Sequence, residues 1–154
     1  MRTPIIVANW KMNLNHLEAI ALTQKLSYQI DKYILEEAEV VLCPPFTDLR
    51  SVQTTIDSDK MHFKLGAQNV NENEKGAFTG EISAPMLAKF GTQYVLVGHS
   101  ERRQHFAETN ETIAAKVKSV LKFSMTPILC VGETREQRDN DQSFEVVEEQ
   151  VNVG

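Results

Sequence analysis

The sequence of 154 residues has the length of one domain with a sizeable core, and we expect a single domain over residues 1–154. Hydrophobic residues make up 42% and charged residues 24% of the chain, which is typical of a globular protein. The net charge of −5 argues against a nucleic-acid partner, because tracking phosphates requires clustered Lys and Arg. No apolar run approaches the ~20 residues that cross a bilayer, and no secretory signal pattern precedes the first apolar run. We therefore expect a cytoplasmic protein with no membrane partner.

Short apolar runs alternate with helical patterns along the whole chain. The runs are rich in Val, Ile and Leu, as in parallel strands covered on both faces, and they span residues 4–9, 39–44, 62–69, 93–99 and 126–133. Helical patterns follow them over residues 16–34, 47–56, 83–91, from Asn110 onward, and over 142–152. Their inward residues are expected to include Leu22, Leu26, Ile30 and Ile34, then Leu49, Val52 and Ile56, then Ile113, Val117, Val120 and Leu121, and finally Phe144, Val147 and Val151. Strand then helix, repeated five times, predicts an α/β fold with a parallel sheet.

Polar residues follow the expected strands at their carboxyl ends. They are Asn9 and Lys11, Gln68 and Asn69, His99 and Glu101, and Gly132 and Glu133. Ligands of parallel α/β folds bind at that rim. The 69–81 stretch is polar, punctuated by glycine and irregular, and a loop of that length inside a compact domain is usually functional.

The residues at this rim leave two readings open. Lys11 is either a solvated loop charge or, with Asn9, a group that neutralises an anionic ligand. His99 is either a histidine satisfied by its surroundings or a neutral hydrogen-bond donor, favoured by a helix beginning at Ser100. If they have no role at a site, Glu101 and the two arginines after it form an exposed charge cluster. We find no phosphate-binding glycine loop, nucleotide fingerprint or metal motif, so we expect chemistry without a cofactor or metal.

Four segments together resemble one known family in order and spacing. They are NWKMN (9–13), GAQNVNENEKGAFTGE (66–81), VLVGHSERR (95–103) and PILCVGET (127–134). They resemble the N-terminal part of the triosephosphate isomerases, and the resemblance covers essentially the whole chain. It implies a partial (β/α)8 barrel, with about five parallel βα units present. The implied activity is the interconversion of dihydroxyacetone phosphate and glyceraldehyde 3-phosphate through an enediolate, in glycolysis and gluconeogenesis.

The resemblance also implies roles for individual residues. Asn9 and Lys11 would bind the substrate, with Lys11 facing its phosphate and counting among the catalytic residues. His99 would be the neutral electrophile that polarises the carbonyl, and Glu101 a supporting acid beside it. Thr79, in the 69–81 loop, would reach toward Asn9 and Lys11 of a second copy, which implies a homodimer.

Two further implications concern a thiol and a missing base. Cys130 would be the family's buried thiol near the site, and Cys43 and Cys130 are both expected to be reduced. A (β/α)8 barrel takes eight strands and ~250 residues, and the family's glutamate base follows the sixth strand. We therefore expect a chain of five strand patterns to be inactive alone.

The alternatives to this function are a non-catalytic half-barrel that binds phosphate or assembles with another chain, and a different (β/α)8 isomerase.

Overall fold

The computed structural model describes residues 2–153, apart from the side chain of Lys32. Five parallel strands form one sheet in the order β1-β2-β3-β4-β5. The strands are β1 (Ile5–Asn9), β2 (Glu39–Cys43), β3 (Phe63–Ala67), β4 (Tyr94–Val97) and β5 (Thr126–Leu129). The helices are α1 (His16–Gln29), α2 (Lys32–Glu37), α3 (Leu49–Ser58), α4 (Ala84–Lys89), α5 (Ser100–Phe106), α6 (Asn110–Lys122), α7 (Arg135–Asp139) and α8 (Ser143–Val153).

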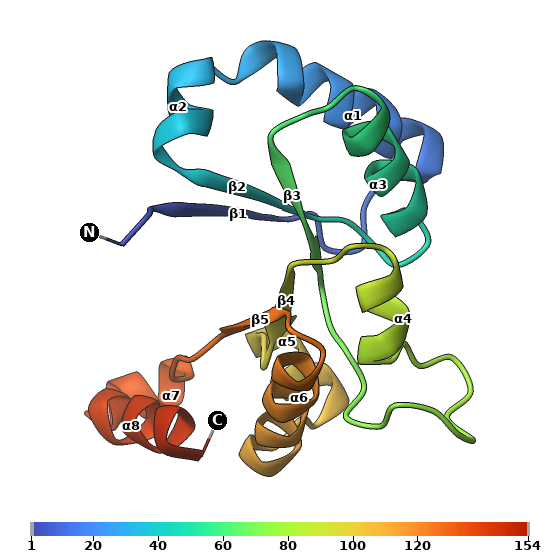
Figure 1. Cartoon of the computed structure of the whole chain (residues 1–154). Coiled ribbons are helices and arrows are strands. Elements are labelled where there is room, and N and C mark those ends of the chain that lie inside the picture. The colour runs from blue at the N-terminus through green and yellow to red at the C-terminus, as the bar shows by residue number, and fades with distance from the viewer. Residues whose placement is uncertain (1, 154) are drawn as a thin grey trace.

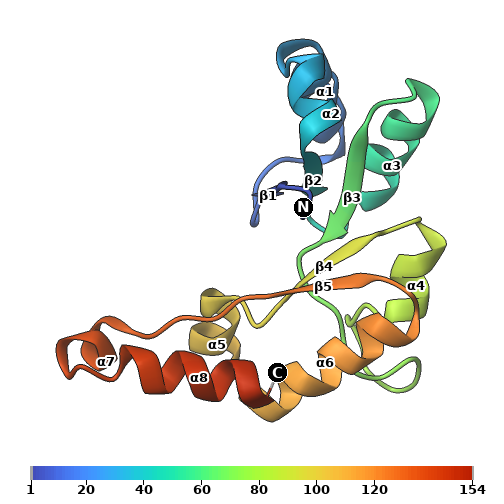
Figure 2. The same ribbon diagram turned by 60° about the vertical axis from the view of Figure 1, so that its left-hand side comes forward.

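The sheet is curled, and its helices lie outside the curl (Figure 1). β3 pairs with β4 only through Gly66–Tyr94 and Ala67–Val95, whereas β1 and β2 are in register from Ile5–Glu39 to Asn9–Cys43. Figure 2 shows the turn at this junction, where β4 and β5 run in a direction different from that of β1 to β3. The fold is therefore an α/β half-barrel of five parallel strands, which confirms the predicted partial (β/α)8 architecture. That the chain is one domain remains a prediction.

Alternate strand residues face two different clusters. Val40 and Leu42 of β2 pack in the large core beneath the helices, together with Leu49 and Val52 of α3. Val41, Cys43 and Leu96 form a second cluster made only of strand residues and residues just after them, on the concave side. This alternation follows from the period of two in a strand, and it places Cys43 inside the curl.

Glycine is required where the concave side is tightest. A β-carbon at Gly66 of β3 would lie 2.4 Å from Sγ of Cys43 and 2.8 Å from Cγ1 of Val41. Real β-carbons do not approach other atoms so closely, so a side chain at this position would push the strands apart.

Several sequence expectations about helices were wrong. The pattern over 16–34 is two helices, because Ile30 is extended and Asp31 caps a new one, its carboxylate accepting from the backbone N–H of Tyr33 at 2.9 Å. Four of the expected inward side chains are exposed instead: Ile34, Leu121, Phe144 and Val151. No element within residues 2–153 covers them.

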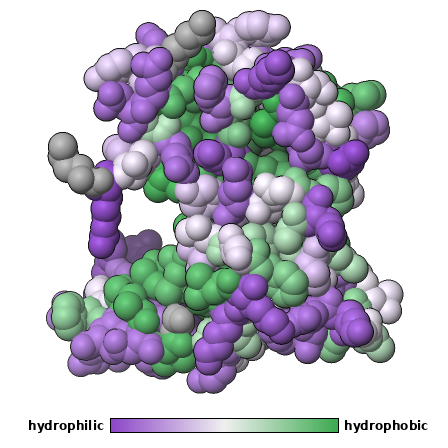
Figure 3. All heavy atoms as spheres, in the orientation of Figure 1, coloured by the Kyte–Doolittle hydropathy of each residue, from purple (hydrophilic) through white to green (hydrophobic). Residues whose placement is uncertain are grey.

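The outer strands are less covered than a buried parallel strand should be. Ile5 and Ile6 of β1 are 44% and 50% exposed, because β1 forms an edge of the sheet. Figure 3 shows hydrophobic residues exposed beside the hollow between the two ends of the curl. Over the described part of the chain, no helix is both long and apolar enough to span a membrane.

Candidate active site

The carboxyl ends of the strands bring the predicted residues to one cavity. Asn9 ends β1, Gln68 follows β3, and His99 follows β4 by two residues. A cavity of about 240 Å³ is lined by Asn9, Lys11, Met12, Phe46, Gln68, Asn69, His99, Glu101, Arg102 and Phe106. Six of the eight predicted rim residues therefore lie around the same space, although Lys11 and Glu101 are 90 residues apart, whereas Gly132 and Glu133 line a different cavity.

The backbone of Lys11 is held in an unusual conformation by two amide side chains. Its φ is +56°, in the left-handed region that residues other than glycine rarely adopt. The Lys11 N–H donates to Oδ1 of Asn9 at 3.0 Å, and its carbonyl accepts from Nε2 of Gln68 at 2.8 Å. Gln68 also donates to the Cys43 carbonyl at 2.9 Å. Asn9 thus supports the Lys11 backbone, and Gln68, one of the polar residues noted at the rim, supports it from a second strand.

The ammonium of Lys11 lies against the carboxylate of Glu101. Nζ of Lys11 is 2.5 Å from Oε1 of Glu101, and both side chains are about half exposed. The hydrogen bond from Lys11 holds the pKa of Glu101 below its usual range. The pair therefore keeps a positive and a negative charge fixed at the mouth of the cavity.

His99 caps helix α5 through its ring. Nδ1 of His99 accepts from the backbone N–H of Glu101 at 3.2 Å, and Oε2 of Glu101 lies 3.6 Å from the same nitrogen. Because Nδ1 accepts, the proton of the neutral ring is on Nε2. The first turn of α5 thus selects which nitrogen of a neutral His99 ring is the donor, and the neutral state of His99 remains a prediction.

A buried ionic network lies behind this cavity. Nε of Arg102 donates to Glu108 at 2.6 Å, and its guanidinium lies 4.6 Å from the centre of the Phe106 ring. Nζ of Lys116 donates to the same Glu108 oxygen and, at 2.9 Å, to Asn69. Burial raises the pKa of Glu108, but the hydrogen bonds from Lys116 and Arg102 outweigh it and hold that pKa low. Arg102 is therefore part of a folded network and not of a loose charge cluster.

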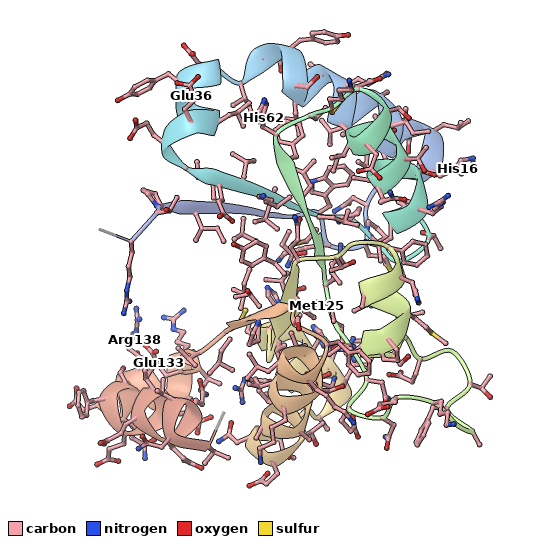
Figure 4. The ribbon with its side chains drawn as sticks, in the orientation of Figure 1. His16, Glu36, His62, Met125, Glu133 and Arg138 are labelled. Atoms are coloured by element: carbon pink, nitrogen blue, oxygen red, sulfur yellow. The ribbon has the colours of Figure 1, made fainter. Side chains whose placement is uncertain are left out.

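A larger cavity lies on the other side of His99. It has a volume of about 560 Å³ and is lined by Gly98, His99, Ser100, Arg103, Cys130, Val131, Gly132, Glu133 and Arg138. The thiol of Cys130 is half-buried there, and burial raises its pKa despite the nearby charge of Arg103. Glu133 accepts from Arg138 at 2.6 Å and from Ser143 at 3.2 Å, and Figure 4 shows the Glu133 and Arg138 side chains together.

Thr79 and the histidines His16 and His62 line neither of these cavities. Thr79 is exposed in the 69–81 loop. His16 begins the outer helix α1 and His62 precedes β3, and Figure 4 places both far from Glu133. Within residues 2–153, no three His, Cys, Asp or Glu side chains are grouped to hold a metal ion.

A curled parallel sheet with polar side chains at its carboxyl rim defines the class of (β/α) barrel proteins that bind small ligands there. A family model described as triosephosphate isomerase matches residues 4–154. The chain belongs to the triosephosphate isomerase family, as the four segments predicted.

Individual relatives agree with this assignment. The triosephosphate isomerase of Saccharopolyspora erythraea is 60% identical over 138 residues, which are 90% of this chain and 53% of the relative. The triosephosphate isomerase of Streptomyces coelicolor is 54% identical over 99% of this chain, which corresponds to 59% of the relative. That of Corynebacterium diphtheriae is 52% identical over 97% of this chain, which corresponds to 57% of the relative. The chain thus spans a little more than half the length of the curated relatives it matches.

Proposed function

We propose that residues 1–154 supply the electrophilic and anion-binding half of a triosephosphate isomerase site. The observation that carries this proposal is the grouping of Lys11, Glu101 and His99 at one cavity, with Nδ1 of His99 engaged so that Nε2 carries the proton. The reaction is the interconversion of dihydroxyacetone phosphate and glyceraldehyde 3-phosphate in glycolysis and gluconeogenesis. We place the protein in the cytoplasm with that pathway.

Each residue acts where charge develops. Nε2–H of His99 donates to the substrate carbonyl oxygen and stabilises the enediolate that forms when a proton leaves the adjacent carbon. The same nitrogen then moves a proton between the two enediolate oxygens. Lys11 faces the phosphate as a point charge, which Glu101 holds in place in the free site. Asn9 keeps the Lys11 backbone in its left-handed conformation.

The general base must come from outside residues 1–154. The family's glutamate follows a sixth strand, and the sheet described for residues 2–153 has five. Glu133 is no substitute, because backbone hydrogen bonding and Arg138 hold its pKa below the usual range, and Arg138 and Ser143 both donate to its Oε1. By itself, the 154-residue polypeptide should therefore bind phosphate ligands better than it turns them over.

We further propose a homodimer through the 69–81 loop, with Thr79 reaching toward Asn9 and Lys11 of the second copy. Apolar side chains exposed on neighbouring segments support it: Met12 (96% exposed), Leu17, Phe78, Met86 and Phe106. An apolar cavity of about 380 Å³, lined in part by Phe46, Ile82 and Met86, lies on α3 and α4 beside this loop.

A hybrid barrel tests the function. Residues 1–154 are joined to the C-terminal remainder of the Saccharopolyspora erythraea triosephosphate isomerase, and conversion of glyceraldehyde 3-phosphate is measured. We expect turnover by the hybrid and none by either half alone. The exposed Ile5 and Ile6 favour the second candidate, an assembly or phosphate-binding half-barrel. A folded, inactive hybrid that binds glycerol 3-phosphate would favour that candidate.

A further inference from the structure

The corner between β4 and α5 is built around Gly98. Its φ is +73°, and a β-carbon there would lie 3.0 Å from Cδ1 of Ile113 and 3.2 Å from Nη2 of Arg103. Only glycine fits both this conformation and this space. The chain therefore turns at a position without a side chain of its own, and neighbouring groups must fix the direction in which the next residue, His99, leaves the strand.

Four hydrogen bonds hold the His99 segment. The His99 carbonyl accepts from the backbone N–H groups of Arg102 and Arg103, at 2.8 and 3.1 Å, and its ring accepts from the N–H of Glu101. The fourth holds the peptide bond between Gly98 and His99, whose oxygen accepts from Nε of Arg103 at 2.9 Å. Only in this last hydrogen bond does the donor belong to a side chain.

The Arg103 guanidinium also ties this peptide to a neighbouring helix. Its Nη1 donates to Oδ1 of Asn110, the first residue of α6, at 2.7 Å. Its Nη2 is buried against Gly98 without a hydrogen-bond partner among the described residues. A planar, rigid fork holds its acceptors in fixed relative directions, whereas a lysine ammonium on its flexible stem does not fix them in this way.

The larger cavity gives this contact its importance. The 560 Å³ space is bordered by Gly98, His99 and Arg103 together, so little packing restrains the corner on that side. Removing the guanidinium would leave the Gly98 carbonyl, at the border of this space, without its side-chain donor, one residue before the histidine that lines both cavities.

We propose that Arg103 is a positioning residue for His99, fixing the 98–99 peptide so that the imidazole faces the substrate cavity. The expected effect of Arg103 on turnover rests on the proposed function. Arg103 itself does not line the substrate cavity. The adjacent Arg102 is engaged elsewhere, with Glu108 and Phe106, and does not share this task.

The test compares Arg103→Ala, Arg103→Lys and the control Arg135→Ala in the hybrid barrel; Arg135 is 94% exposed and lines neither cavity. For Arg103→Ala we expect kcat to fall about 10- to 100-fold with KM within about twofold, because small misplacements of a reacting group have effects of this size. Arg103→Lys should recover part of the loss. Added guanidinium ion, entering through the adjoining cavity, should raise kcat of Arg103→Ala but not of the control.

Imidazole nitrogen spectra of the histidine-labelled hybrid provide a readout independent of turnover. The unsubstituted protein should show His99 with Nδ1 accepting, and Arg103→Ala a second ring state that guanidinium removes. An unchanged ring spectrum, or a rise in KM at constant kcat, would overturn the proposal. If the unsubstituted hybrid is itself inactive, the proposed function fails, and the ring spectra alone then decide whether Arg103 positions His99.

Discussion

His99 and Lys11 are held in contrasting ways, although they share a cavity. The His99 ring is fixed by the first turn of α5, and its side chain is only 23% exposed. Lys11 is fixed at its backbone, while its side chain is 52% exposed and is paired only with Glu101. A rigid imidazole suits a group that must act as charge develops, whereas an exposed ammonium suits a group that must exchange a carboxylate for an arriving phosphate.

His99→Gln in the hybrid barrel should therefore affect the chemical step. We expect kcat to fall by about 100-fold or more, because one donor to a developing oxyanion is removed, with little change in the affinity for glycerol 3-phosphate. Steady-state kinetics and calorimetry measure the two quantities. A loss confined to binding would contradict the electrophilic role.

Lys11→Met should instead weaken the binding of glycerol 3-phosphate. Loss of a charge-assisted hydrogen bond to a phosphate predicts an affinity lower by about 10- to 100-fold, measured by calorimetry. Lys118→Met, on the exposed side of α6, is the matched control. Unchanged affinity in the Lys11 variant would remove this residue from the phosphate site.

Most of the rim could be predicted from the sequence, because each residue follows directly on an apolar run. Asn9, Lys11, His99 and Glu101 needed only the rule that parallel strands present their carboxyl ends at one edge. The network behind them could not be predicted. Lys116 meets Asn69 across 47 residues of chain, and no local spacing encodes a contact that depends on how β3 and α6 pack.

At the level of elements, α8 fastens the loop that follows β5. The side-chain amide of Gln150, which is buried, pairs with both backbone groups of Gly132: Oε1 accepts from the N–H at 2.8 Å and Nε2 donates to the carbonyl at 3.1 Å. This pairing imitates a strand-to-strand hydrogen bond where β5 has ended. It keeps the loop that borders the larger cavity attached to the last helix.

Gln150→Leu should lower the free energy of unfolding of the hybrid barrel by about 1–3 kcal/mol, because two backbone groups lose their partner. Gln150→Glu keeps the acceptor but loses the donor and places a buried carboxylate oxygen against the Gly132 carbonyl, so it should cost at least as much. Urea unfolding measures both, with Gln24→Leu on the exposed face of α1 as the control. Equal stability of the Leu variant and the unsubstituted protein would show that the pairing contributes nothing.

The helices show two features that the spacing of apolar residues does not predict: where a helix breaks, and which side chains are covered. Apolar residues recur every four positions from Leu22 to Ile34, and this spacing continues through the break at Ile30 as if one helix were present. The cap formed by Asp31 ends that pattern locally. Phe144 follows the inward spacing of α8 yet is exposed, because periodicity identifies a face without showing what covers it.

For the whole molecule, the outward edges of β1 and β5 are the dominant feature. Both are sheet edges, which invite pairing with other chains, and the exposed Ile5 and Ile6 add apolar surface to one of them. A polypeptide of residues 1–154 made by itself should therefore self-associate, and it should show no isomerase activity above background.

Sedimentation and an assay with glyceraldehyde 3-phosphate test this expectation, and addition of a separate polypeptide carrying the missing strands should restore some turnover. A monodisperse monomer that melts cooperatively would contradict the expected pairing of the sheet edges. Isomerase activity of that monomer would contradict the proposal that the general base lies outside residues 1–154.

The strand order has a consequence for how the chain is made. Because each strand pairs with the strand that precedes it in the sequence, every strand after β1 finds its partner already synthesised. Ribosomal synthesis can thus lay down the sheet one βα unit at a time, from β1 to β5. The two-residue junction between β3 and β4 divides this process, so that the nascent β1–β3 layer, with α1 packed on α3, can take shape before β4 leaves the ribosome.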